Sequence, residues 1–171
     1  MSKSQFVVSV HDLINKPGNM RETELDFHLD EPLGDGAASV AKGVLLELDL
    51  RLESVHEGIL ATGKVFTNAT SECSRCLDPI KLPVEVDFQE LFTYSGSSED
   101  DLKVQDDSID LDPAIRDAVV LSLPFQPVCN PDCLGLCAEC GVKLADDPDH
   151  AHEVAIDSRW SELQKFQNKK D

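Results

Sequence analysis

The sequence has few basic residues, few aromatic residues and no long apolar run. It contains 15 Lys and Arg against 33 Asp and Glu, a formal net charge of −18, and only 5% of its 171 residues are aromatic. Direct binding to a phosphate backbone depends on clustered Lys and Arg, so this composition argues against a general nucleic-acid binder. The more natural partner is a basic protein, or a nucleic acid that is contacted only through a single local basic patch. The same charge could also serve solubility alone.

Features of secreted and membrane proteins are missing as well. Residues 1–14 (MSKSQFVVSVHDLI) lack the charged leader, apolar core and cleavage site of a signal peptide. The longest uncharged stretch, 118–131, is too short for a membrane span and contains three prolines. We therefore expect a cytoplasmic protein. There, structural disulfides are rare, and clustered cysteines more often bind metal or carry out redox chemistry.

Alternation with a period of two predicts a β-rich core. Four leucines alternate with charged residues over 46–53, as expected of an antiparallel strand with one wet face. Alternating runs follow at 58–73 and 82–89, and a CxxC motif lies at the turn between them. We therefore predict an antiparallel meander over 44–94, preceded by extended pieces near 6–10 and 25–29.

The rest of the chain predicts a loop and two helices. Residues 95–112 carry seven acids against Lys103, which is typical of a solvated loop. Asp112 and Pro113 indicate the cap and first residue of a helix that ends near Ser122. A second helix is predicted from about Asp157, with an apolar stripe of Trp160, Leu163 and Phe166.

These elements predict an α+β fold: an antiparallel β meander with a few short helices and a C-terminal segment that the Cys and His pairs described next predict to be zinc-binding. We place a β-rich core domain at 1–127, including the acidic loop 95–112. We place the zinc-binding segment and the C-terminal helix at 128–171, packed on the core.

Six cysteines and two histidines form four close pairs in the sequence. A structural zinc site takes four Cys or His ligands in a tetrahedron, usually as two close pairs that the fold brings together. Four pairs are enough for two closed sites. Gly141, directly after one pair, suits the tight turn of a zinc knuckle. The pairs are Cys73 with Cys76, Cys129 with Cys133, Cys137 with Cys140, and His150 with His152.

The pairs can combine in two ways. Proximity in sequence favours a site from Cys137, Cys140, His150 and His152, which leaves Cys129 and Cys133 to reach Cys73 and Cys76 across the fold. In the alternative, Cys129, Cys133, Cys137 and Cys140 form one site, and Cys73 and Cys76 remain a bare dithiol. We favour two structural zinc sites, because the alternative leaves a CxxC unused. The two histidines could also be ordinary solvated residues in an acidic loop.

No catalytic motif accompanies these ligands. The sequence contains no HExxH, no HxE…PCxxC, no Gly-rich phosphate loop and no nucleophile elbow. Catalytic zinc needs an open coordination position, whereas every candidate ligand here is already paired. A redox CxxC is expected at a helix N-terminus, where the thiol pKa is lowered, but Cys73 and Cys76 fall between predicted strands. We therefore expect a protein that is not an enzyme.

The cysteine-rich part of the sequence resembles a known family. The turn CxxC after a meander, LSLPFQPVC (121–129) and CNPDCLGLCAECGVKL (129–144) resemble the YceD family of large ribosomal RNA subunit accumulation proteins. The segment HDLINKPGNMRE (11–22) resembles the opening of its actinobacterial members. Many members carry a further cysteine pair where this sequence has His150 and His152, and histidine in place of cysteine preserves a zinc site.

The resemblance implies a role in accumulation or processing of 23S rRNA, and so in biogenesis of the large ribosomal subunit. The implied partner is the precursor of that subunit, through a basic ribosomal protein or the 23S rRNA, with no membrane contact and no small-molecule substrate. The alternative function is a cytosolic zinc-handling or thiol-redox sensor protein. Such a protein should exchange zinc readily or form disulfides on mild oxidation, whereas structural sites should resist both.

Overall fold

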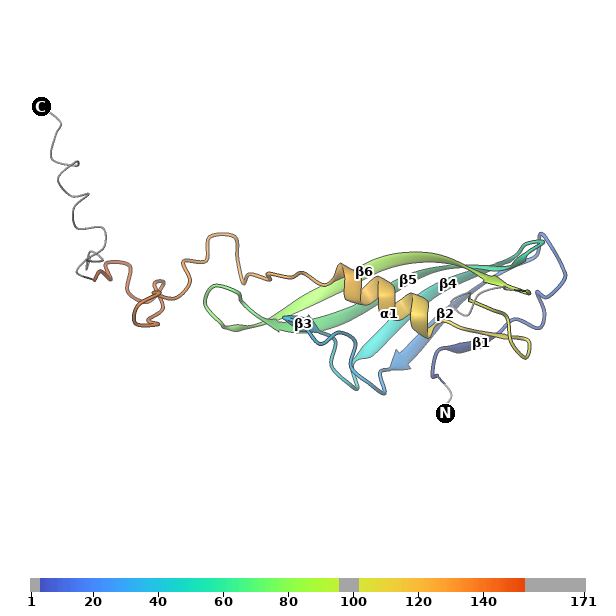
Figure 1. The fold of residues 1–171 in the computed structure, drawn as a ribbon, viewed down its shortest axis with the longest axis horizontal. Helices are drawn as coiled ribbons and strands as arrows, with labels where there is room; N and C mark the ends of the chain where they lie inside the picture. Colours follow the sequence, from blue (N-terminus) through green and yellow to red (C-terminus); the bar gives the residue numbers. More distant parts are fainter. Residues whose placement is uncertain (1–3, 96–101, 153–171) are drawn as a thin grey trace, which may run out of the picture. The chain divides into compact units, whose positions relative to one another are not determined.

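The computed structural model describes residues 4–95 and 102–152 (Figure 1). The chain divides into two compact units, Met1–Cys133 and Leu134–Asp171. The named strands and the helix all belong to the first unit. The helix predicted from Asp157 lies outside the described residues. Within the described ranges, no helix combines the length and apolar character that a membrane crossing requires.

The first unit is built on an antiparallel sheet. β2 (Met20–His28), β4 (Leu45–Ser54), β5 (Gly58–Glu72) and β6 (Pro79–Thr93) lie side by side in that order, and β3 (Ala38–Ser39) pairs with the far end of β5 (Figure 1). β4, β5 and β6 follow one another as hairpins, so the meander predicted over 44–94 is confirmed.

A second, two-stranded sheet joins distant parts of the chain. β1 (Val7–Ser9) pairs antiparallel with β7 (Ser108–Asp110). β7 lies within the segment that we predicted as the acidic loop 95–112, so part of that segment is a strand. Ile109 is buried, whereas the neighbouring Asp110 is exposed. Burial of this apolar side chain explains why this part of the segment packs against the protein as a strand.

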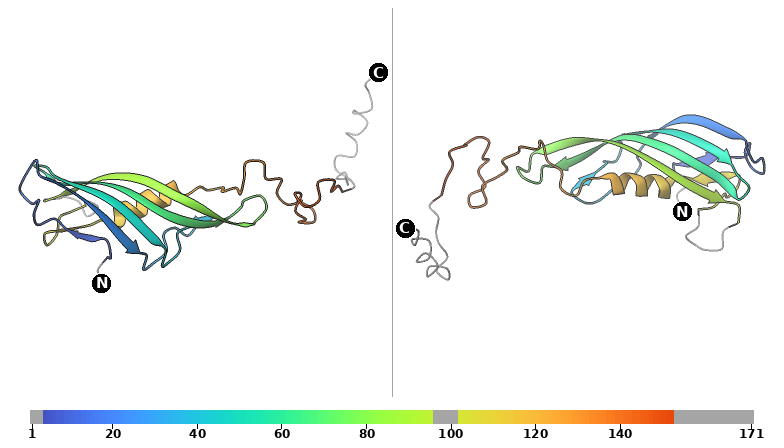
Figure 2. Two further views of the ribbon diagram at one scale, coloured as in Figure 1. Left: turned by 180° about the vertical axis from the view of Figure 1, so that it is seen from behind. Right: turned by 90° about the horizontal axis from the view of Figure 1, so that it is seen from above.

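The hydrophobic core lies on one face of the main sheet. The alternating leucines of β4 are at most 2% exposed, and Ile59, Ala61, Val65 and Ala69 of β5 are fully buried. α1 (Asp112–Ser122) lies against this face (Figure 2) and buries Ile115 and Val119 in the same cluster. Removal of this apolar surface from water is the main stabilising term. The described residues are therefore mostly β with one helix.

The start of α1 differs slightly from the prediction. Its bounds agree, but Leu111 occupies the N-cap position and makes no side-chain cap bond. Asp112 lies instead in the first turn, where its carboxylate is 3.4 Å from the Arg116 guanidinium. A negative charge there is favourable because it faces the positive end of the helix dipole.

Candidate metal centres

The first cluster combines the turn of a hairpin with the segment after α1. Cys73 and Cys76 lie between β5 and β6, and the fold brings Cys129 and Cys133 to them, with all four sulfur atoms within 4.8 Å of one another. The Sγ atoms of Cys73 and Cys133 are 3.9 Å apart, and those of Cys76 and Cys129 are 3.8 Å apart. Tetrahedral zinc with Zn–S distances of about 2.3 Å separates its sulfur ligands by about 3.8 Å. The four cysteines therefore fit a closed zinc site.

Hydrogen bonds hold the two halves of this cluster together. Ser74 donates from its backbone N–H (2.8 Å) and its hydroxyl (3.0 Å) to the carbonyl of Pro127. The Arg75 guanidinium donates to the carbonyls of Pro131 and Cys133, each at 3.0 Å. These bonds come from the two residues between Cys73 and Cys76. The CxxC turn therefore positions the second ligand pair through its intervening residues as well as through its sulfurs.

The thiols of the first cluster differ in acidity. Backbone N–H donation from Cys76, and further from Arg75 and Cys129, lowers the pKa of Cys73 to about 6. Donation from the Asp78 backbone lowers the pKa of Cys76, but burial and the neighbouring thiols outweigh it and raise the value to about 12. Four thiols this close cannot all ionise without a cation between them, because their charges repel. Metal binding here must therefore release protons.

The second cluster lies within residues 134–152. Cys137, Cys140, His150 and His152 place their ligand atoms within 4.8 Å of one another. The Sγ of Cys140 is 3.1 Å from His150 Nε2 and 3.3 Å from His152 Nε2, and the two Nε2 atoms are 2.8 Å apart. Two thiolates and two imidazoles that converge on one point fit a tetrahedral zinc site.

Each histidine of the second cluster also faces a carboxylate. His150 Nδ1 lies 3.5 Å from Asp147 Oδ2, and His152 Nδ1 lies 3.3 Å from Glu139 Oε2. A carboxylate at Nδ1 favours the tautomer that carries its proton there and leaves Nε2 free to bind a metal. Sequence analysis did not find Asp147 and Glu139, because acids in an acidic loop resemble ordinary solvated residues.

Both CxxC turns have the same backbone geometry. Cys73 donates its N–H to Asp78 (2.8 Å) and accepts one from Leu77 (2.9 Å). Cys137 likewise donates to Val142 (2.8 Å) and accepts from Gly141 (2.9 Å). The residue after the second cysteine is left-handed in each turn, with φ of 61° at Leu77 and 75° at Gly141. The tight turn expected at Gly141 is confirmed, and Leu77 adopts it without the freedom of glycine.

We expect Leu77→Gly to stabilise the first unit by about 0.5–1 kcal/mol. The left-handed conformation costs a non-glycine residue about 1–2 kcal/mol, and the extra entropy of unfolded glycine cancels part of the gain. Little packing is lost, since Leu77 is 58% exposed. Urea unfolding measures the change. Leu77→Ala keeps the strained backbone and is the matched control; equal stability of the two variants would contradict the strain argument.

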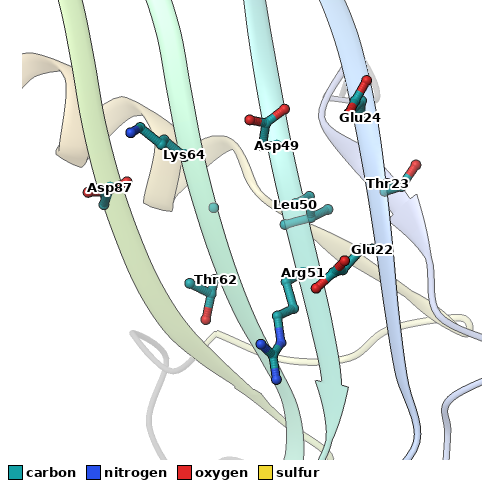
Figure 3. A pocket seen from close by; sticks show the side chains of 10 residues that line it. Glu22, Thr23, Glu24, Asp49, Leu50, Arg51, Thr62, Lys64 and Asp87 are labelled. Atoms are coloured by element: carbon teal, nitrogen blue, oxygen red, sulfur yellow. The ribbon is translucent and has the colours of Figure 1, made fainter.

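The face of the sheet opposite the core is acidic. It carries a hollow of about 600 Å³ across β2, β4, β5 and β6 (Figure 3). Arg51 and Lys64 are the only basic residues among the ten that line it. Lys64 pairs with Glu85 at 2.5 Å, which raises its pKa, and Arg51 pairs with Glu53 at 2.8 Å. The acids that line the hollow are Glu22, Glu24, Asp49 and Asp87.

Like charges oppose each other on this face. The β2–β4 register places Glu24 opposite Asp49 and Asp26 opposite Glu47. Such cross-strand pairs of equal charge are unfavourable, and no ion pair relieves Glu24, Asp26 or Glu47 within the described ranges. The face therefore has a negative potential that a cationic partner would neutralise.

Comparisons with known proteins identify relatives of most of the chain. The profile of the family described as "Large ribosomal RNA subunit accumulation protein YceD" matches residues 61–167. An uncharacterised protein of Mycobacterium tuberculosis is 45% identical over 167 residues, which cover 94% of this chain and 80% of the relative. A Mycobacterium leprae protein is 44% identical over 167 residues, covering 94% of this chain and 76% of the relative.

A plant relative bears the family name. The maize "Large ribosomal RNA subunit accumulation protein YCED homolog 1, chloroplastic" is 46% identical over 39 residues, 23% of this chain and 13% of that protein. No solved structure matches the chain. The family profile covers more than half of the chain and includes all eight residues of the two clusters. The chain therefore belongs to the YceD family of large ribosomal RNA subunit accumulation proteins.

Proposed function

We propose that this protein is a zinc-stabilised, non-enzymatic factor that supports the accumulation or processing of 23S rRNA and so the biogenesis of the large ribosomal subunit. The observation that carries the proposal is the family match over 61–167, which spans both clusters. A factor of this kind acts in the cytoplasm, where bacterial ribosomes assemble, and it acts by binding.

The metal in this proposal has a structural task. Each cluster offers four ligand atoms, the full set for tetrahedral zinc, so no position is left for a reacting water. The first cluster would join the β5–β6 hairpin to the segment 127–133, and the second would close the segment 137–152. Bound zinc would cross-link the segments that carry its ligands. The chain would hold the thiolates and imidazoles close together, where one ion can reach them all.

The acidic sheet face supports a basic ribosomal protein as the direct partner. Ribosomal proteins that contact rRNA are rich in Lys and Arg, and such a surface complements the hollow lined by Glu22, Glu24, Asp49 and Asp87. The opposed acids of β2 and β4 would gain most from a cation between them.

Depletion of the protein in its host tests the function. We expect 23S rRNA and mature large subunits to fall relative to 16S rRNA and small subunits, and expression of the wild-type gene to restore them. Unchanged 23S rRNA, together with no large-subunit component recovered in a pull-down, would refute the proposal.

Removing charge from the sheet face tests the partner. The double variant Glu24→Gln/Asp49→Asn is expected to reduce the recovery of basic large-subunit proteins several-fold at low salt, since surface electrostatics dominate such encounters. Its thermal stability should change little, because the repulsion between Glu24 and Asp49 is removed together with the attraction between Asp49 and the opposite Lys64. Asp30→Asn/Glu31→Gln removes the same charge from an exposed loop and serves as the control. Equal recovery with both variants would exclude this face.

A further inference from the structure

We propose that the two clusters are metal sites of different kinds. The first is a permanent structural site, whereas the second is a reversible zinc site that fills and empties while the first unit stays folded. This inference rests on the zinc binding in the proposed function and is independent of the ribosomal role.

The surroundings of the two clusters differ in burial. In the first, Cys73 is 0% and Cys76 is 8% exposed, Cys133 is half-buried and Cys129 is exposed. In the second, no ligand is buried, and Cys140 and His152 are exposed. Zinc in the first cluster would therefore be covered on the side of the hairpin turn, where two of its ligands are buried, whereas zinc in the second would have no buried ligand and be open to a chelator or an acceptor protein.

The segment around the second cluster lacks an apolar core of its own. Of residues 134–152, only Gly135 is buried. A segment of this size cannot bury enough apolar surface to offset its loss of conformational entropy. For such segments the free energy of metal binding is the free energy of folding. Order in 134–152 is thus expected to depend on zinc.

Contacts that would hold the second cluster together without metal are few and local. Two backbone bonds close the Cys137–Cys140 turn, Leu144 donates to Gly135 at 3.0 Å, Asp146 donates to Lys143 at 3.1 Å, and Leu136 and Lys143 form an isolated β-bridge. His150 donates its backbone N–H to Asp147 at 3.1 Å, three residues away. Within the described ranges, the contacts between the cysteine turn and the histidines are those of the ligand atoms and the His152–Glu139 pair. The metal is therefore the main cross-link of this segment.

The first cluster differs because its halves are joined without metal. The bonds from Ser74 and Arg75 to 127–133 connect residues more than fifty positions apart in the sequence. They keep the thiols near one another after a metal ion leaves, so rebinding is fast and net loss is slow. A chelator is therefore expected to remove zinc from the second cluster before it removes zinc from the first.

Asp147 and Glu139 are the positioning residues of the reversible site. Each contacts the Nδ1 of one histidine and orients Nε2 toward the metal. Loss of such an outer partner lowers metal affinity roughly 10–100-fold in other sites. The affinity of the second site, and with it the zinc level at which 134–152 orders, is set by these two carboxylates. A partner that contacts this segment would then bind only the zinc-loaded chain.

Stepwise chelation of the full-length, zinc-loaded protein tests the inference. EDTA is added in steps, native mass spectrometry counts zinc, and hydrogen–deuterium exchange follows residues 134–152 and 58–93. We expect a species with one zinc that has lost protection only in 134–152. Simultaneous loss of both ions, earlier loss of protection in 58–93, or a chain that binds no zinc would each overturn it. Unchanged 23S rRNA in depleted cells would leave this result untouched.

Paired substitutions test the positioning residues. Asp147→Asn/Glu139→Gln is expected to weaken the second zinc roughly 10–100-fold and leave the affinity of the first unchanged. Asp146→Asn/Asp149→Asn removes the same charge from the same segment, at acids for which no histidine contact is found in the described ranges, and should change neither affinity. If both variants weaken the second site equally, total charge and not histidine orientation controls it, and the assignment of Asp147 and Glu139 is wrong.

Discussion

Cys73→Ser is expected to lower the melting temperature of the first unit by about 10 °C or more, because loss of a metal is among the largest effects of a single substitution and each kcal/mol shifts the melting temperature of such a domain by several degrees. Cys73 is fully buried, and its sulfur accepts N–H bonds from Arg75 (3.5 Å) and Cys129 (3.4 Å). A serine hydroxyl does not replace the thiolate as a zinc ligand, so the remaining three thiols would lose the metal. The segment 127–133 would then be held to the hairpin by hydrogen bonds alone.

His152→Ala is the matched control for this experiment. It removes one ligand of the second cluster, which belongs to the other unit, so the melting of the first unit should stay as in the wild type. Circular dichroism of the β-sheet signal measures the melting of the first unit in the wild type and in each variant. Coincident melting of wild type and Cys73→Ser would mean that no metal in the first cluster stabilises the fold.

Zinc affinity of the first cluster is expected to rise with pH, by about a hundredfold or more per unit between pH 7 and pH 8. The pKa of Cys76 is raised to about 12, and that of Cys129 is raised chiefly by its hydrogen bond with Cys133, so both thiols are protonated in the metal-free protein at pH 7. Each proton that zinc displaces contributes about tenfold per pH unit. Cys73, with a pKa of about 6, is already ionised and adds little in this range.

The sign of this dependence is definite. Since protons compete with zinc, metal-dependent stability is present at the higher pH and is lost as the pH falls. Competition with a zinc-binding dye at pH 7.0, 7.5 and 8.0 measures the slope, and Cys73→Ser provides the background from the second cluster. A flat or falling affinity would show that the thiols are ionised before the metal arrives.

Local pattern was enough to predict the meander and the helix. The leucines at 46–52 reveal a one-sided strand because alternation depends only on neighbours in sequence, and Pro113 indicates a helix start for the same reason. β1 and β7 could not be paired in this way. Their residues are about a hundred positions apart, and the alternation of Ile109 and Leu111 with acids is too short to reveal the contact.

The two Cys/His groups were predictable from the sequence, but the residues that position them were not. Close Cys and His pairs are visible in the sequence, and the structure gathers the eight residues into the two groups that we favoured. Ser74 and Arg75 are ordinary polar residues in the sequence. Their hydrogen bonds to the segment 127–133 depend on where the fold places that segment. The same holds for Asp147 and Glu139, which acquire meaning only once each lies beside an imidazole.

The most direct test of the account is the number of zinc ions per chain, counted by native mass spectrometry in the wild type, Cys73→Ser and His152→Ala. Two ions in the wild type and one in each variant are predicted, because each substitution removes a ligand from a different cluster. A single ion that survives Cys73→Ser would contradict the account and would favour one site from Cys129, Cys133, Cys137 and Cys140.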